Sequence, residues 1–308
     1  MVQSLQQYCT MEDHDHYATF LDFSKAYDMV DQGFLFDVLA EMNVGPSFLD
    51  WVRLLYRAPW VQIIFNGALG PKIRPTRGVK QGCPLSCLLF VLHLEPLGAM
   101  LRAQPHLGIP LPTGEPLTSL FFADDSTLMS YDLSAAVEQL AIVEEFCHVS
   151  GARLNQSKCM TLVFNGHLDP ADVDGGGVLN ILPSGRPVKY LGLLLGHQLP
   201  ADHQVQMLND RFMSCFQQWG CRACTLQGRR LLVNTVMLSL LWHVTAVVPV
   251  PVAMVERWQR RLQRLMVGPT HDSPPWQALV QRQFSRVMGK LYRATHPHDF
   301  LAYLPHAR

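Results

Sequence analysis

The stretch LFFADDSTL, residues 120–128, places two adjacent aspartates inside an apolar run. The apolar residues on either side predict a β-hairpin whose tight turn carries Asp124 and Asp125. A buried carboxylate is very costly unless it is paired or binds a metal ion. The chain must therefore fold so that this turn reaches either water or a source of positive charge.

The composition favours a globular protein. Of the 308 residues, 48% are hydrophobic and 16% are charged, which allows a sizeable core in one large domain or two smaller ones. Disordered, collagen-like and disulfide-scaffold proteins are excluded. The eight cysteines are irregularly spaced, which indicates reduced thiols inside a cell. The N-terminal sequence lacks the basic head and apolar centre of a signal peptide, so we expect a protein that is not secreted.

The net charge of zero hides an uneven distribution. Acidic residues outnumber basic ones by nine to three in residues 1–60 and by ten to four in residues 111–200. Basic residues outnumber acidic ones by five to one in residues 61–110 and by thirteen to five in residues 201–308. An ordinary surface could produce this pattern, and so would an acidic metal centre flanked by phosphate-binding surfaces.

Hydrophobic periodicity predicts an α+β fold followed by a helical part. We expect strands within 17–21, 61–78, 119–130, 158–164 and 188–196, and helices at 33–44, 48–56, 83–101 and 133–150. The pattern becomes purely helical after Gly196, which puts the main domain boundary near residue 197 and the next one at 268–275. The apolar run 231–248 is barely long enough to span a bilayer and contains Asn234 and His243, so we expect a buried helix there.

Three carboxylates are the candidate chemical centre. Asp22 ends the first predicted strand, and Asp124 and Asp125 occupy the hairpin turn. Carboxylate oxygens are ligands that Mg²⁺ prefers, often together with substrate phosphates. Two such ions can clamp the attacking and leaving oxygens of a phosphoryl displacement, which is catalysed largely by positioning and charge stabilisation. An exposed acidic turn remains the alternative reading of the aspartate pair alone.

Five motifs occur in a fixed order: FLDFSKAYDMVD, RGVKQGCPLSCLLFVLHLEPL, LFFADDSTL, SGARLNQSKCM and VKYLGLLLG. Together they resemble the palm motifs of reverse transcriptases, most closely those of non-LTR (LINE-type) retrotransposons. The resemblance covers residues 17–196 and continues more weakly through LQGRRLLVNTVMLSLLWHV, which resembles the thumb of that family. One such motif would be weak support, whereas five in order are specific.

The resemblance implies a polymerase-type palm, an antiparallel sheet backed by helices, followed by a helical thumb. The implied domains are a palm with partial fingers at 1–196, a thumb at 197–268 and a C-terminal tail at 269–308. The implied activity is that of an RNA-directed DNA polymerase, which adds deoxynucleotides to a DNA primer on an RNA template with two Mg²⁺ or Mn²⁺ ions. The family also implies an intracellular, nuclear protein without a membrane.

The family's functional residues can be carried over by motif. Asp22 and Asp124 resemble its metal-binding aspartates, and Asp125 the third acidic residue beside them. Tyr27 resembles the side chain that packs beneath the incoming sugar and excludes a 2′-hydroxyl; a core aromatic is the alternative. Lys158 resembles the lysine that assists pyrophosphate departure; a solvated lysine at a strand end is the alternative.

Other implied contacts concern the template and the primer. Gln81 and Gly82 resemble the segment that lies against the templating base and nucleotide, and glycine suits a close backbone approach. Arg77 and Lys80 flank that turn and either meet phosphate or are solvated loop charges. The primer grip of the family is matched by Tyr190, Leu191 and Gly192, for which strand core is the alternative.

A basic helix face is predicted in the last third of the chain. Its members are Arg257, Arg260, Arg261 and Arg264. The opposite, apolar face is formed by Val255, Trp258, Leu262 and Leu265. Four arginines on one side suit a surface that follows a nucleic-acid backbone, although a merely soluble face would look the same.

Two further clusters are weaker candidates. The acidic and histidine residues at 12–16 could bind a metal, but we expect a flexible, solvated lead-in. Cys221 and Cys224 form a C-x-x-C pair without a second pair at zinc spacing.

The N-terminal part departs from the family pattern. The resemblance places basic finger residues upstream of Asp22, whereas residues 1–21 contain no lysine or arginine. We therefore expect the chain to correspond to the palm and thumb of a longer protein or of a decayed element. An inactive nucleic-acid-binding remnant is the main alternative. Another two-metal palm enzyme, such as a cyclic-dinucleotide cyclase, is disfavoured because the RGVKQGCPLS block and thumb-like helices serve a template.

Overall fold

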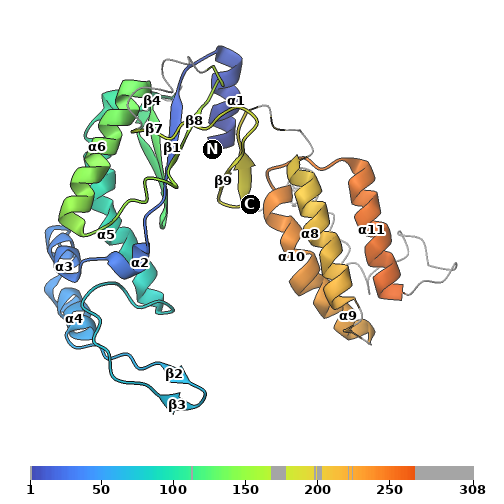
Figure 1. Cartoon of the computed structure of the whole chain (residues 1–308), viewed down its shortest axis with the longest axis horizontal. Coiled ribbons are helices and arrows are strands. Elements are labelled where there is room, and N and C mark those ends of the chain that lie inside the picture. The colour runs from blue at the N-terminus through green and yellow to red at the C-terminus, as the bar shows by residue number, and fades with distance from the viewer. Residues whose placement is uncertain are drawn as a thin grey trace, which may run out of the picture. The chain divides into compact units, whose positions relative to one another are not determined.

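The computed structural model describes residues 2–111, 114–167, 178–197, 199, 203–220, 222–223 and 225–267. The chain forms two compact units (Figure 1). Unit 1 comprises the described residues of 1–190 and 195–197, and unit 2 those of 191–194 and 198–267. Each unit has its own hydrophobic core and is described by itself.

Unit 1 is built on a four-stranded antiparallel sheet with the strand order β6-β7-β1-β8. Its strands are β1 (Tyr17–Leu21), β6 (Ser119–Phe122), β7 (Asp125–Ser130) and β8 (Met160–Val163). β1 is central and all five of its residues are buried, as the apolar sequence predicts. The ADD motif therefore lies where the edge strand β6 turns into the inner strand β7.

Both faces of this sheet are covered by helices (Figure 1). Ala18 and Phe20 of β1 pack with α1 (Val2–Glu12) in one core cluster. Leu21 packs in another cluster with α5 (Pro84–Arg102) and α6 (Leu133–Ser150). The alternation along β1 thus assigns neighbouring residues to opposite cores. The mixed α+β arrangement with an antiparallel sheet and covering helices agrees with the predicted fold class.

Three helices connect β1 to the hairpin region: α2 (Ala26–Met29), α3 (Gln32–Glu41) and α4 (Pro46–Tyr56). Asp31 caps α3, because its Oδ1 accepts a hydrogen bond from the Phe34 N–H at 3.1 Å. Gly45 precedes α4 with a φ of 89°, a conformation that favours glycine. The predicted helices at 33–44 and 48–56 correspond to α3 and α4.

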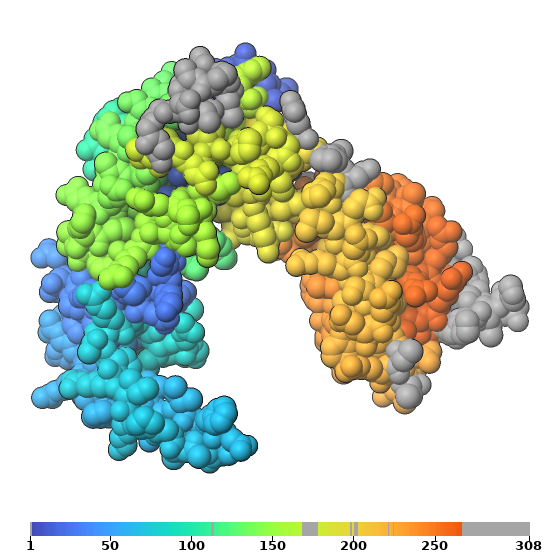
Figure 2. All heavy atoms as spheres, viewed as in Figure 1, coloured from blue at the N-terminus to red at the C-terminus, as the bar shows by residue number. Residues whose placement is uncertain are grey.

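A two-stranded hairpin follows, formed by β2 (Ile64–Phe65) and β3 (Ala68–Leu69). Asn66 and Gly67 form its turn with φ angles of 47° and 80°. Asn-Gly is the sequence that such turns favour, so the predicted glycine turn is confirmed. Residues 61–69 are all exposed, and the hairpin protrudes from the rest of unit 1 (Figure 2, cyan).

The remaining short elements of unit 1 are a 3₁₀ turn (Pro105–Leu107), β4 (Ile109–Pro110), β5 (Pro116–Leu117) and β9 (Val188–Tyr190). The chain passes from unit 1 to unit 2 after Tyr190, the last residue of β9, and β10 (Leu193–Leu195) follows. Among the described helices, α5 is long and apolar enough to cross a bilayer. Core helices pass the same test, and α5 contributes several fully buried leucines to the core of unit 1.

After residue 202 the secondary-structure elements of the described part of unit 2 are all helical and are joined by turns and irregular segments, as the helical pattern of the sequence predicts. Its elements are α8 (His203–Trp219), α9 (Leu226–Leu232), a π-helical turn (Val233–Met237), α10 (Ser239–Thr245) and α11 (Val252–Val267). Trp258 is fully buried, and its indole N–H donates to Asn209 Oδ1 at 3.1 Å. The run 231–248 is not one continuous helix, because the π-helical turn separates α9 from α10. It is also only partly buried: Met237 and Leu241 are fully buried, while Leu231 is 65% exposed.

A buried histidine leads to a prediction about stability and pH. His93 of α5 is 2% exposed and lies edge-on to Phe34 and Phe146. Burial lowers the pKa of His93 from 6.5 to about 4, against the opposing effect of Asp31. Between these two values the unfolded chain binds a proton that the folded chain does not.

The stability of unit 1 should therefore fall by about 3 kcal/mol as the pH decreases from 6.5 to 4, since one pKa unit corresponds to about 1.4 kcal/mol. His93→Phe should remove this part of the pH dependence, measured by chemical unfolding of the whole chain at several pH values. His106→Phe, at an exposed histidine, is the matched control. An identical pH profile for His93→Phe and the unmodified chain would contradict the prediction.

Candidate active site

The strand register brings the three candidate carboxylates to one end of the sheet. Leu21 of β1 pairs with Ser126 of β7, so the next residues, Asp22 and Asp125, leave the paired strands at the same end. Phe122 pairs with Asp125 across the hairpin, which leaves Ala123 and Asp124 as the two-residue turn. Ala123 has a φ of 52°, a left-handed conformation that β-turns of this kind require and that alanine adopts with strain.

The negative charges of Asp124 and Asp22 act on the third carboxylate, Asp125. The pKa of Asp125 is raised above its ordinary value, first by burial and then by the negative charges of Asp124 and Asp22. Like charges that share a site disfavour each other's ionised form. The electrostatic potential at this end of the sheet is therefore negative, and a bound cation would stabilise the ionised carboxylates.

Lys158 lies beside this group. Its Nζ is 3.9 Å from Asp22 Oδ2, and both side chains are partly exposed. The segment that carries it is fastened to the strand end. Asn155 N–H donates to the Asp22 carbonyl at 2.8 Å, and Asp22 N–H contacts the Cys159 sulfur at 3.4 Å. The backbone thus holds Lys158 next to Asp22, and its side chain is largely exposed.

Tyr27 of α2 is positioned by stacking and by the backbone. Its ring stacks on Phe90 of α5 with centroids 4.6 Å apart, and its carbonyl accepts the Val79 N–H at 2.9 Å. The pKa of Tyr27 is raised, mainly by burial, then by a hydrogen bond with the Cys87 thiol, and further by the negative charges of Cys87 and Asp124. Tyr27 therefore packs on the core and also lies within the electrostatic reach of Asp124.

The segment 75–82 runs alongside α2. Gly78 donates its N–H to the Val30 carbonyl at 2.8 Å, and its carbonyl accepts the Gln32 side-chain amide at 3.1 Å. A Cβ at Gly78 would lie 2.9 Å from the Asp28 carbonyl oxygen, and its φ is 84°. Glycine is therefore required here for the close approach of two backbones.

The polar side chains of this segment have different environments. Gln81 Nε2 donates to Asp28 Oδ1 at 3.1 Å. Arg77 lies 3.9 Å from an Asp31 carboxylate oxygen, and the ammonium of Lys80 lies 6.0 Å from the centre of the Tyr56 ring. Gly82 has a φ of 82° and open space where a Cβ would be. The backbone at this turn is accessible to a ligand.

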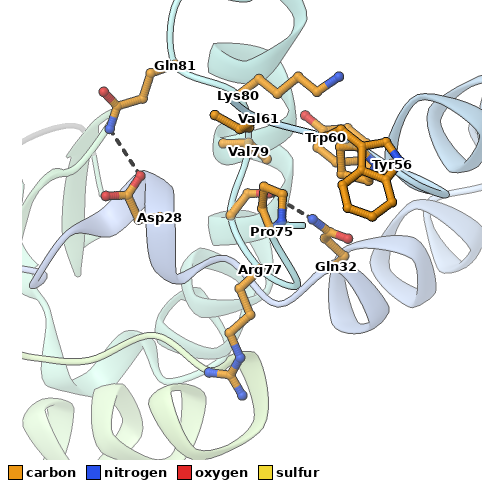
Figure 3. A pocket seen from close by; sticks show the side chains of 12 residues that line it. Asp28, Gln32, Tyr56, Trp60, Val61, Pro75, Arg77, Val79, Lys80 and Gln81 are labelled. Carbon is orange, nitrogen blue, oxygen red and sulfur yellow. Dashed lines mark hydrogen bonds between the residues drawn. The ribbon is translucent and has the colours of Figure 1, made fainter. Parts of the chain in front are cut away.

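A cavity of about 600 Å³ adjoins this segment (Figure 3). Arg77, Lys80 and Gln81, which the sequence selects, line it together with residues that the sequence analysis does not select. The additional lining residues are Asp28, Gln32, Tyr56, Pro59, Trp60, Val61, Pro75, Gly78 and Val79. A signal for them exists in the sequence, since Tyr56 and Trp60 stand immediately before a segment rich in basic residues.

The three primer-grip candidates lie at the β9–β10 turn. Tyr190 belongs to unit 1, and its ring is 5.1 Å from that of Phe20. Leu191 and Gly192 belong to unit 2 and have φ angles of 47° and 82°. The Leu191 carbonyl contacts a ring nitrogen of His243, and a Cβ at Gly192 would lie 3.3 Å from the same ring. The turn is therefore fixed against α10.

The basic helix face is exposed on α11. All four of its members are exposed: Arg257, Arg260, Arg261 and Arg264. In the described part of the chain none of them forms an ion pair with a carboxylate. The Arg261 guanidinium lies 5.6 Å over the Phe216 ring, and on the other side of the helix Trp258 and Leu262 are fully buried.

Residues 12–15 of the expected lead-in are exposed, as a solvated segment would be, whereas His16 is buried and a packed helix precedes the segment. Val2, Leu5 and Cys9 repeat at helical spacing and are buried, so α1 forms and packs on the sheet. His16 is 6% exposed, and its Nδ1 lies 2.7 Å from the Tyr131 carbonyl oxygen. The buried residues of α1 thus pack the N-terminal part of the chain on the sheet.

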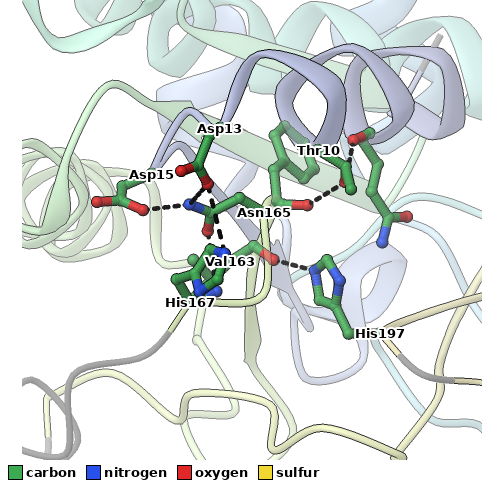
Figure 4. A network of polar contacts seen from close by, with 9 residues as sticks. Thr10, Asp13, Asp15, Val163, Asn165, His167 and His197 are labelled. Atoms are coloured by element: carbon green, nitrogen blue, oxygen red, sulfur yellow. Dashed lines mark hydrogen bonds and ion pairs between the residues drawn. The ribbon is translucent and has the colours of Figure 1, made fainter.

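The acidic residues after α1 form polar contacts with the end of β8 (Figure 4). The Asn165 side-chain amide donates to the carboxylates of Asp13 and Asp15, and His167 Nε2 lies 3.4 Å from Asp13 Oδ1. Within the described residues, no three histidine, cysteine, aspartate or glutamate side chains are gathered closely enough to hold a metal ion. Cys221 and Cys224 lie outside the described residues.

The three carboxylates of Asp22, Asp124 and Asp125 nevertheless fit divalent ions by their chemistry. They supply only oxygen ligands and come from two neighbouring strand ends, and the charges of Asp22 and Asp124 add to the effect of burial in raising the pKa of Asp125. A cation there would relieve the repulsion that raises the pKa of Asp125.

Comparisons with known proteins identify the family of the chain. The family described as "Reverse transcriptase (RNA-dependent DNA polymerase)" matches residues 2–195. The Transposon TX1 uncharacterized 149 kDa protein of Xenopus laevis is 28% identical over 79% of this chain. The Pol polyprotein of the R2DM element of Drosophila melanogaster is 32% identical over 49%, and that of the R2 element of Nasonia vitripennis is 31% identical over 63%.

The chain spans 19%, 14% and 20% of the lengths of these three relatives. A structure of telomerase from Candida albicans with a fragment of telomeric RNA matches with a TM-score of 0.45 at 10% identity, over 100% of this chain and 54% of that one. That similarity is too low to carry an argument. The family match covers more than half of the chain, which therefore belongs to the reverse transcriptase family and is homologous to proteins of the non-LTR retrotransposons R2 and TX1.

Proposed function

We propose that this chain is the palm (residues 1–196, with partial fingers) and thumb (residues 197–268) of an RNA-directed DNA polymerase that extends a DNA primer on an RNA template. The observation that carries the proposal is the placement of Asp22, Asp124 and Asp125 at the same end of the sheet. Family membership supports the same reaction class. A nuclear location belongs to the proposal and rests on the resemblance alone.

The carboxylates would hold the metal ions. Asp22 and Asp124 would be the principal ligands and Asp125 an additional one, as the resemblance of their motifs to those of the family implies. Bound Mg²⁺ or Mn²⁺ would supply charge neutralisation for the triphosphate and activation of the primer hydroxyl. Two-metal catalysis needs carboxylates from different parts of the chain in one place, which the register of β1 and β7 supports.

Other side chains have roles that their positions support. Lys158, next to Asp22, would donate a proton to the departing pyrophosphate. Tyr27 would lie beneath the sugar of the incoming deoxynucleoside triphosphate. Gln81 and Gly82 would lie against the templating base, where the open space at Gly82 permits a close approach. The nearby cations Arg77 and Lys80 would meet phosphate.

The direct test is template-dependent incorporation by the purified chain. Labelled deoxynucleotides should be added to a DNA primer on an RNA template in the presence of Mg²⁺, and omission of either the template or the primer should stop incorporation. Binding of the template–primer duplex without any incorporation, even with Mn²⁺ and long incubation, would favour the inactive nucleic-acid-binding remnant instead. Template-independent product would point to a different two-metal enzyme.

The exposed basic face of α11 makes a separate prediction about binding. Replacing Arg257, Arg260, Arg261 and Arg264 with Gln should flatten the salt dependence of template–primer binding. Each lost phosphate contact lowers the slope of log K against log salt by about 0.9 for duplex DNA and about 0.7 for a single strand. The four substitutions together should lower it by about three units.

The matched control keeps the charge. The same four positions changed to Lys should retain most of the slope, because lysine also neutralises phosphate. Fluorescence anisotropy with a labelled template–primer between low and moderate salt measures both variants. A slope that is the same in the Gln variant and the unmodified chain would show that this face is only a soluble surface.

A further inference from the structure

One segment of unit 1 has a charge that differs from the rest of the chain. Residues 57–82 carry five basic and no acidic side chains, although the net charge of the chain is zero. The basic residues are Arg57, Lys72, Arg74, Arg77 and Lys80, and all are exposed. Within the described residues only Arg77 forms an ion pair, a long one with Asp31. This surface attracts an anionic partner.

The same segment exposes large apolar side chains. Trp60 is 60%, Ile64 70% and Phe65 82% exposed. The two short strands pair only with each other among the described residues, and residues 61–69 are all exposed, so the hairpin does not bury these side chains itself. Exposed aromatic rings between cations are the composition of surfaces that stack the bases of a single nucleic-acid strand and neutralise its phosphates.

The 600 Å³ cavity at the base of the hairpin has the size of a small-ligand site. Figure 3 shows the rings of Tyr56 and Trp60 on one side and Gln81 with Asp28 on the other. The ammonium of Lys80 lies over the Tyr56 ring. A planar base could stack on Trp60 in this space, with hydrogen-bonding groups and a cation within the same lining.

We propose that this cavity holds an unpaired base of the template strand and that the adjoining hairpin binds the nucleotides beyond it. The inference rests on the proposed function and deepens it by naming where the single-stranded part of the template lies. Charge complementarity selects a nucleic acid as the occupant, because the segment is basic and the neighbouring carboxylates of Asp28 and Asp31 are already engaged by Gln81 and Arg77. The cavity is also continuous with the proposed contact to the templating base, because Gln81 lines the cavity and directly precedes Gly82. This continuity supports the template strand as the occupant.

The test measures binding rather than catalysis. The whole chain is mixed, in EDTA and without nucleotides, with a labelled primer–template duplex that is either blunt or carries a six-nucleotide 5′ template overhang. Trp60→Ala should weaken binding of the overhang duplex about tenfold, since stacking contributes about 1–3 kcal/mol per base. Its affinity for the blunt duplex should change less than twofold. Trp60→Phe should restore most of the loss.

Trp51→Ala is the matched control, because Trp51 is 66% exposed on the neighbouring helix α4 and does not line the cavity. It should leave both affinities unchanged. In a second measurement, 2-aminopurine at the first unpaired template position should change its fluorescence on binding to the unmodified chain and not to Trp60→Ala. The overhang is made of RNA in one duplex and of DNA in another, and the two affinities show which nucleic acid the surface prefers.

Three outcomes would overturn the proposal. Equal losses for blunt and overhang duplexes would mean that Trp60 does not contact the single strand. Equal effects of Trp51→Ala and Trp60→Ala would mean that the cavity has no special role. Self-association of the chain that Trp60→Ala abolishes, with unchanged overhang binding, would assign the surface to a second copy. Because no metal or nucleotide is present, these results are independent of incorporation, so failure of the catalytic proposal is seen separately.

Discussion

Replacing Asp124 with Asn should abolish template-dependent incorporation and leave the fold intact. Asn has nearly the same shape as Asp, and Asp124 is exposed in a two-residue turn where no buried partner would be lost. The substitution removes one negative ligand from the group formed with Asp22 and Asp125. Metal ions contribute several kcal/mol of transition-state stabilisation, so the rate should fall by about a thousandfold or more.

Primer extension measures this effect, and thermal unfolding checks the fold. Asp50→Asn is the matched control, because Asp50 is an exposed aspartate of α4 that forms only a surface ion pair with Arg53. That variant should keep full incorporation. The unfolding temperature of Asp124→Asn should equal or exceed that of the unmodified chain, since the substitution relieves repulsion on Asp125. Undiminished incorporation by Asp124→Asn would exclude a ligand role for this residue.

The sequence predicts the part of the fold that local signals determine. The apolar residues around the ADD turn define β6 and β7, and the Asn-Gly pair at 66–67 defines the turn between β2 and β3. Gly151 ends α6 in the left-handed conformation with a φ of 75°. Each of these features depends on a few neighbouring residues, so periodicity and turn chemistry are sufficient to predict it.

Features that depend on distant contacts are not predictable in the same way. The helix α1 has only three buried residues, and its formation depends on the sheet face that it covers. The register that aligns Leu21 with Ser126 joins residues more than a hundred positions apart, so the sequence indicates the motifs but not their distance. The cavity by Trp60 is lined by residues from the end of α4, from 59–61 and from 75–81, so no single stretch of the sequence predicts it.

The polar residues within the run 231–248 illustrate a different limit of prediction from hydropathy. The side chains of Asn234, Thr235 and Ser239 donate to carbonyls three or four residues earlier, within and next to the π-helical turn. Such local bonds compete with regular helix hydrogen bonding. Hydropathy averages over this chemistry and therefore predicts one continuous helix where the structure has two helices and a wider turn.

Tyr27→Ala should admit ribonucleotides. The Tyr27 ring is held by its stack on Phe90 and lies within the electrostatic reach of Asp124, so a nucleotide whose phosphates are bound near Asp124 would place its sugar close to this ring. Removing the ring removes the group that would clash with a 2′-hydroxyl. A steric difference of this size is worth about 1–3 kcal/mol, so discrimination against ribonucleotides should weaken by about tenfold to a hundredfold.

Tyr27→Phe separates the ring from the hydroxyl. It keeps the stack on Phe90 and loses only the hydrogen bond with Cys87, so it should discriminate nearly as well as the unmodified chain. The measurement is the ratio of kcat/KM for a deoxynucleotide and its ribonucleotide in single-nucleotide primer extension, which is insensitive to the fraction of folded enzyme. A general loss of activity in Tyr27→Ala with an unchanged ratio would mean that Tyr27 only supports the packing of α2 on α5. A changed ratio in Ala but not in Phe would assign the selection of the sugar to the ring.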